Sequence, residues 1–140
     1  MGKINLKGVI IGGLVAGVVL NVIDFVLMGV VLKNDMAAAM QALGKPPVPD
    51  SMIPWFVVVD FLLGIALVWV YAAIRPRFGA GPATAIKAGL IGWVLVCVFF
   101  VLFWWPMGIL PQNLLVITTL VALVQQPLAV VVGAKFYTEM

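Results

Sequence analysis

Four long apolar stretches constrain the fold of this chain more than any other feature. They cover residues 8–32, 53–74, 88–105 and 113–134. A helix that spans a bilayer needs about 20 mostly apolar residues, each adding about 1.5 Å to its length. Only 9% of the 140 residues are charged, whereas a soluble domain has about 25%. The sequence therefore predicts an all-α integral membrane protein with four transmembrane helices in a single membrane domain, residues 1–140.

Lysine and arginine residues gather on one side of the predicted membrane. That side holds Lys3, Lys7, Arg75, Arg77, Lys87 and Lys135. The opposite side holds only Lys33 and Lys45. Short loops rich in Lys and Arg remain in the cytoplasm. We therefore expect both the N-terminus and the C-terminus to be cytoplasmic.

Residues 34–44 form a polar segment that is too short to cross the membrane but carries helix signals. Asn34 can cap a helix, Asp35 favours its first turn and Gly44 can end it. We interpret the segment as a short interfacial helix, lying on the outer membrane surface or over the mouth of the bundle. A docking surface for a partner is the alternative.

A faint internal similarity relates the first half of the chain to the second. Residues 6–8 with Gly12 resemble residues 86–88 with Gly92, and residues 77–78 resemble residues 135–136. Either the chain contains two duplicated helical hairpins, or apolar helices look alike by chance.

Small residues mark the faces on which the predicted helices can approach one another. Gly13 and Gly17 lie one turn apart on the first helix, and Gly64 lies on the second. Small side chains allow helix backbones to come close in lipid. We interpret these glycines as helix-packing positions within the chain; a dimerisation motif is the alternative.

Polar side chains inside the apolar stretches form a second recurring feature. They are Asn21, Asp24, Asp60, Thr118 and Gln125. Asp24 and Asp60 each lie about 10–12 Å below the outer end of their helix, so they share a level. Polar groups in lipid turn toward the bundle interior, where partners are available. The sequence therefore predicts an intramembrane polar cluster.

Two interpretations of this polar cluster remain open. Its members can hold the helices together through hydrogen bonds, or they can bind a proton, a cation or a ligand. No Lys or Arg is expected at this level. Two ionised Asp side chains there would repel each other, so at least one should hold a proton, share one or meet a cation.

Several function classes lack the residues that they require. Histidine is absent and Cys97 is the single cysteine, so an internal disulfide is excluded and we expect no metal site. The basic residues are scattered, which gives no support for nucleic-acid binding. No catalytic nucleophile with its base is recognisable, so we predict that the chain is not an enzyme. We expect no cofactor, although a bound lipid is compatible with the composition.

One resemblance extends over nearly the whole chain. The sequence YAAIRPRFGAGPATA at residues 71–85 and the sequence NVIDF at residues 21–25 resemble a widespread family of uncharacterised bacterial proteins with four spanning helices. That family has no assigned activity. The resemblance implies a four-helix fold in the bacterial cytoplasmic (inner) membrane.

These observations lead to two functional hypotheses. The first is a non-catalytic accessory or structural subunit that packs against other subunits of a larger bacterial membrane protein complex. The second is a small homo-oligomeric transporter or channel, coupled to protons or cations through Asp24 and Asp60. In both, the chain's partners are the lipid bilayer and either other membrane proteins or further copies of itself.

Overall fold

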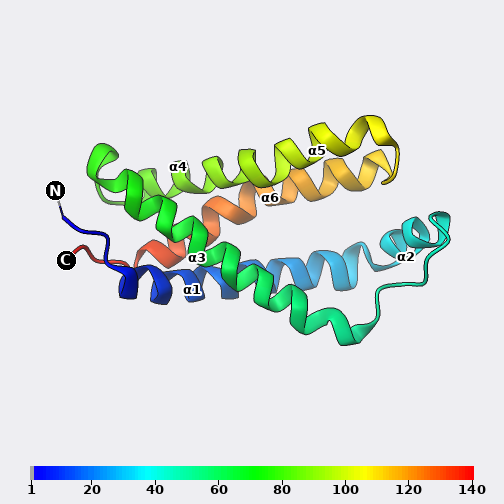
Figure 1. The fold of residues 1–140 in the computed structure, drawn as a ribbon, viewed down its shortest axis with the longest axis horizontal. Coiled ribbons are helices and arrows are strands. Elements are labelled where there is room, and N and C mark those ends of the chain that lie inside the picture. The colour runs from blue at the N-terminus through cyan, green and yellow to red at the C-terminus, as the bar shows by residue number, and fades with distance from the viewer. Residues whose placement is uncertain (1) are drawn as a thin grey trace.

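The computed structural model describes residues 2–140, and every regular element in that range is helical (Figure 1). Four of the helical segments are long and apolar enough to cross a membrane: Leu6–Val31, Asp50–Phe78, Pro82–Met107 and Gln112–Ala134. The predicted all-helical architecture with four long apolar helices is confirmed.

Within these segments the helical geometry changes several times. The elements are α1 (Leu6–Val26) with a π-helical continuation (Leu27–Val31), α2 (Lys33–Ala42), a 3-10 turn (Asp50–Met52), α3 (Ile53–Phe78), α4 (Pro82–Trp93) with a π-helical continuation (Val94–Val98), α5 (Phe99–Trp104), a 3-10 turn (Trp105–Met107) and α6 (Gln112–Ala134). The second and third apolar helices are therefore longer than the predicted ranges 53–74 and 88–105.

Proline and glycine explain these differences in length. The predicted range 53–74 stops before Pro76, but Pro76 lies in the last two turns of α3, and the helix continues to Phe78. Gly79, with φ of 84°, ends it, and its N–H donates to the carbonyl of Arg75 at 2.8 Å. Pro82 then stands in the first turn of α4, where its missing N–H costs no hydrogen bond. Pro82 therefore begins α4, whereas Pro76 does not end α3.

The interior of the bundle is built where α1, α3, α4 and α6 meet. α1 packs against α3 and α6, and α4 packs against α6 and α3. The buried apolar residues of this core are Val9, Ala16, Leu20, Leu67, Val68, Tyr71, Ala72, Ala85, Ala88, Ala129, Val130 and Tyr137. The core thus draws on all four long helices.

Glycine allows the closest of these helix contacts. At the crossing of α1 and α3, a Cβ atom added to Gly64 would lie 2.5 Å from the carbonyl oxygen of Gly13 and 2.6 Å from the nitrogen of Gly17. The structure therefore places all three predicted packing glycines at one crossing. Gly12 and Gly133 make a similar backbone contact between α1 and α6.

The short helix α2 lies close to the predicted range 34–44 and folds back onto the bundle. Its Ala39 is buried with Leu27 and Leu32 at the end of the first span and with Leu114 of α6. These contacts place α2 against the ends of α1 and α6, over the bundle. A position at a membrane surface stays a prediction.

Both ends of the chain lie together at one end of the molecule (Figure 1). Asn5 caps α1 by accepting a hydrogen bond from the N–H of Gly8 at 3.0 Å, and its amide donates to the carbonyl of Thr138 at 2.9 Å. α1 starts here, α3 ends here, α4 starts here and α6 ends here. The six basic residues that were predicted to share one side belong to these helix ends or to the adjoining segments.

The two halves of the long helices are packed differently. We call residues 6–26, 60–93 and 119–137 the basic half, and residues 27–59 and 94–118 the distal half. In Figure 1, α3 lies near α4 in the basic half and diverges from α5 in the distal half. Buried residues of the distal half are only Leu27, Leu32, Ala39, Leu114 and Leu115. Most of the core therefore belongs to the basic half.

Candidate functional site

Asp24 of α1 and Gln125 of α6 form a direct polar contact where the two halves meet. The side-chain amide of Gln125 donates to Oδ1 of Asp24 at 2.8 Å and to the carbonyl oxygen of Leu20 at 3.2 Å. Gln125 is buried, with 6% of its surface exposed. The two hydrogen bonds of Gln125 therefore join α6 to α1 and orient the side chain of Asp24.

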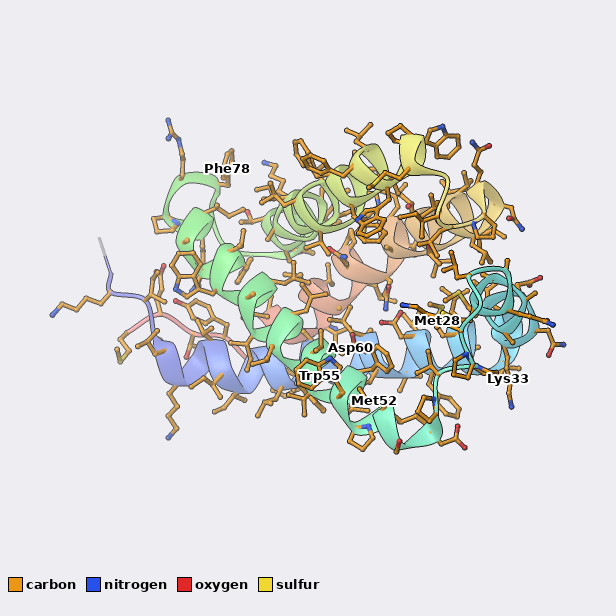
Figure 2. The ribbon with its side chains drawn as sticks, turned by 45° about the vertical axis from the view of Figure 1, so that its right-hand side comes forward. Met28, Lys33, Met52, Trp55, Asp60 and Phe78 are labelled. Atoms are coloured by element: carbon orange, nitrogen blue, oxygen red, sulfur yellow. The ribbon has the colours of Figure 1, made fainter. Side chains whose placement is uncertain are left out.

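Asp60 of α3 completes a group of three. Its carboxyl group lies within hydrogen-bonding reach of the carboxyl group of Asp24. Figure 2 shows Asp60 partway along α3, between Trp55 near the start of the helix and Phe78 at its end. We call Asp24, Asp60 and Gln125 the carboxyl cluster.

No basic residue neutralises the carboxyl cluster. Among residues 2–140 the single ion pair joins Arg75 and Glu139, 4.0 Å apart, at the basic end. Two carboxylates without a counter-ion repel each other strongly in a medium of low dielectric constant. A proton on one carboxyl group turns this repulsion into a hydrogen bond, and a cation between the two groups would also relieve it.

Two residues of the predicted polar cluster have other partners. The amide of Asn21 donates to the carbonyl of Gly17 at 2.9 Å and to the carbonyl of Val57 at 3.3 Å, which joins α1 to α3. Thr118 donates to the carbonyl of Leu114 in its own helix at 2.8 Å. Neither side chain is hydrogen-bonded to the carboxyl cluster.

Gln126 was not predicted as a site residue, yet it is the more deeply buried of the two adjacent glutamines. It is 3% exposed. Its amide nitrogen lies 3.4 Å from the sulfur of Cys97, and its side-chain oxygen is buried without a hydrogen-bond partner. Successive helical residues differ by about 100° in direction, so Gln126 faces α4 while Gln125 faces α1. The Gln-Gln pair in an apolar helix was the signal that could have revealed it.

Irregular helix geometry surrounds these polar residues. The π-helical segment Leu27–Val31 follows Asp24 by three residues, and the π-helical segment Val94–Val98 contains Cys97. Pro127, next to Gln126, lies inside α6 and has no N–H to donate. Such interruptions are frequent at functional sites and are tolerated in membranes where protein buries them.

A closed apolar layer separates the carboxyl cluster from the basic end. Leu20 is 1% exposed, Leu67 is 2% exposed, and Val68 and Val130 are 0% exposed. These residues lie one to two turns from the cluster toward the basic end. These buried apolar side chains thus lie between the carboxyl cluster and the basic end in this conformation.

The chemistry available at the cluster is that of two carboxyl groups and one amide. Such a group can hold and exchange a proton, or bind a cation through carboxylate oxygens. In the described range, 2–140, no three or more His, Cys, Asp and Glu side chains come together as a set that could hold a metal ion. No family model matches the chain, and no curated protein or solved structure matches it.

Proposed function

We propose that this chain is a non-catalytic accessory subunit that packs against a larger membrane protein complex. The observation that carries this proposal is the unequal packing of the two halves. Residues 51–59, which include the first two turns of α3, are all exposed within the chain. An apolar helix that is exposed on every face can be surrounded by lipid or by the helices of a partner.

The exposed side chains of the distal half are large and aromatic. Trp55 is 64% exposed and Phe103 is 73% exposed. Aromatic residues bury much surface in protein contacts and are enriched at protein interfaces. The closed apolar layer beneath the carboxyl cluster also favours a packing role over a conducting one.

Photo-crosslinking in the native membrane tests this proposal. A photoreactive amino acid at Phe103 should produce a discrete adduct with a larger membrane protein. The same amino acid at Leu14, which is 44% exposed but lies in the basic half, serves as the matched control and should produce much less of that adduct. Purification in mild detergent should recover the same partner.

Recovery of the chain only as a free monomer or homo-oligomer, with no adduct to another protein at Phe103, would contradict the accessory role. Adducts of equal yield from Phe103 and Leu14 would contradict the assignment of the partner to the distal half.

The proposed location is the bacterial cytoplasmic membrane, with both termini in the cytoplasm. Its support is the distribution of basic residues, six at the end that holds the termini against Lys33 and Lys45 elsewhere, together with the rule that Lys and Arg remain inside. The likeness of residues 71–85 to an uncharacterised bacterial family supports the bacterial assignment. In this orientation the carboxyl cluster lies nearer the outer surface.

The carboxyl cluster favours a second candidate function, a proton- or cation-coupled transporter or channel made of several copies of the chain. Its specific support is the meeting of Asp24 and Asp60 with Gln125 at 2.8 Å from Asp24. A carboxyl group at this depth costs about 2.5–3.5 kcal/mol on insertion scales. Because of this cost, we expect the two carboxyl groups to serve a function beyond helix packing.

Flux measurements in proteoliposomes at several pH values test this second candidate. Asp24→Asn and Asp60→Asn should each abolish flux or its dependence on pH, whereas Asp35→Asn, an exposed carboxyl on α2, should have no effect. Unchanged flux in both cluster variants would exclude the transporter.

A further inference from the structure

A groove of about 450 Å³ runs along the surface where α1 and α3 meet in the basic half. Its lining residues are Leu6, Val9, Ile10, Leu62, Ile65, Ala66, Trp69 and Val70. None of these side chains carries a charge, and Trp69 is 48% exposed. The groove therefore presents an apolar trough to whatever surrounds the bundle.

Two basic side chains, Arg77 and Lys3, belong to the segments that continue from the groove toward the basic end. On α3, the exposed residues Leu62, Ala66, Trp69 and Arg77 lie on one face, because their spacings of 4, 7 and 15 residues are close to whole helical turns. On α1 the groove begins at Leu6, and the exposed Lys3 precedes it. Arg77 thus follows the groove-lining residues along α3, and Lys3 precedes those of α1 in the chain.

We propose that this groove holds an acyl chain of an anionic phospholipid whose phosphate lies at the basic end, near Arg77 or Lys3. The proposal is independent of the accessory role and of the transporter. A phosphate carries the charge that complements the six basic residues of this end, where Glu139 is the one acidic side chain. The apolar trough complements the hydrocarbon.

The lining favours a lipid chain over a helix of a partner. Helices pack closely in lipid through small residues, but Ala66 is the only small residue among the eight that line the groove. Leucine, isoleucine, valine and tryptophan hold a second backbone away. A flexible acyl chain needs no small residue and no hydrogen bond, so it fits between these side chains.

Native mass spectrometry of the full chain, freed of lipid in detergent, tests the proposal. Phosphatidylglycerol should remain bound roughly tenfold more strongly than phosphatidylcholine, because each basic residue near an anionic headgroup adds a favourable interaction. Equal retention of the two lipids would overturn the assignment of an anionic headgroup.

Filling the groove separates specific binding from a general affinity for lipid. Ala66→Phe should reduce the retention of phosphatidylglycerol roughly tenfold, and the smaller change Ala66→Leu should reduce it less. Val94→Phe is the matched control, since Val94 lines a second apolar groove of about 310 Å³ that is formed by Leu90, Ile91, Val94 and Leu95. Equal effects of Ala66→Phe and Val94→Phe, or no effect of either Ala66 change in folded protein, would overturn the groove assignment.

Removing the cations tests the headgroup separately. The double change Lys3→Gln and Arg77→Gln should lower the retention of phosphatidylglycerol to that of phosphatidylcholine and leave phosphatidylcholine unchanged. An unchanged preference for phosphatidylglycerol would show that these two residues do not hold the phosphate, and would overturn the proposed site.

Discussion

The basic half and the distal half of this molecule are built from similarly apolar sequence but are stabilised by different contacts. In the basic half, glycines bring helix backbones together, as at Gly64 against Gly13 and Gly17, and side chains such as Val68 are completely buried. In the distal half, residues 51–59 are all exposed. The basic half is thus held by its own packing, while the distal half leaves apolar surface that the proposed accessory role assigns to lipid or to a partner.

The carboxyl cluster lies where these two halves meet. Below it is the closed apolar layer that includes Leu20 and Val68, and beyond it α3 diverges from α5 (Figures 1 and 2). The polar residues therefore mark the end of the core that the chain packs by itself. Matched substitutions in the two halves should therefore have different effects.

Thiol labelling gives the largest expected contrast, because its outcome is all or none. In a Cys97→Ala background, an impermeant reagent applied to intact cells should modify Ser51→Cys in the distal half and leave Ala80→Cys at the basic end unmodified. Ala80 is exposed within the chain, so the reagent would reach a cysteine there if the basic end faced outward. The reverse labelling pattern would place the basic end outside.

Truncation of a core side chain should give the largest change in stability. Leu20, with 1% of its surface exposed, packs in the core, so Leu20→Ala should lower the free energy of unfolding by about 3 kcal/mol. Leu102→Ala in α5, where the side chain is 62% exposed, should change it by less than about 0.5 kcal/mol. Reversible unfolding in detergent measures both. Equal losses would show that the two halves are equally packed.

The four apolar helices could be predicted from the sequence because length and hydropathy alone define a possible span. Helix ends were harder to predict, because a proline such as Pro76 can either end a helix or lie in its final turns, and the sequence does not distinguish the two. The extension of α3 to Phe78 depends on Gly79, whose positive φ is not visible in a hydropathy pattern. Local backbone geometry, rather than apolarity, therefore determines the residue at which α3 ends.

The candidate site was predictable to the extent that it follows helical periodicity. Asp24, Asp60 and Gln125 share a level and face the interior, and the structure brings them together. Thr118 does not join the carboxyl cluster, because a threonine in a helix can donate to its own backbone, as it does to Leu114. Gln126 was not among the predicted site residues because it lies about 100° from the face of α6 that carries Gln125, and its partner Cys97 belongs to another helix.

Glycine substitution tests the close contacts of the basic half. A Cβ atom at Gly64 would lie 2.5 Å from a backbone oxygen of α1, so Gly64→Ala should destabilise the fold by about 2 kcal/mol through overpacking. Gly29 is the matched control in the distal half, because a Cβ atom there would meet nothing closer than Phe25 at 3.8 Å. Gly29→Ala should leave stability unchanged or slightly raised. A neutral Gly64→Ala would show that α1 and α3 can separate freely.

The smallest expected effect concerns the carboxyl cluster itself. Gln125→Leu removes the donor that lies 2.8 Å from Asp24 and should lower the free energy of unfolding by about 1 kcal/mol, the usual scale of a polar contact between helices in a membrane. Thr118→Val is the matched control, because Thr118 donates only to carbonyls of its own helix, and it should cost less than about 0.5 kcal/mol. Asp60→Asn should cost as little, because an amide at this position can donate to Asp24 and no longer repels it. If Gln125→Leu lowers the free energy of unfolding no more than Thr118→Val does, the amide of Gln125 does not stabilise the fold. The difference between the two halves would then come from apolar packing alone.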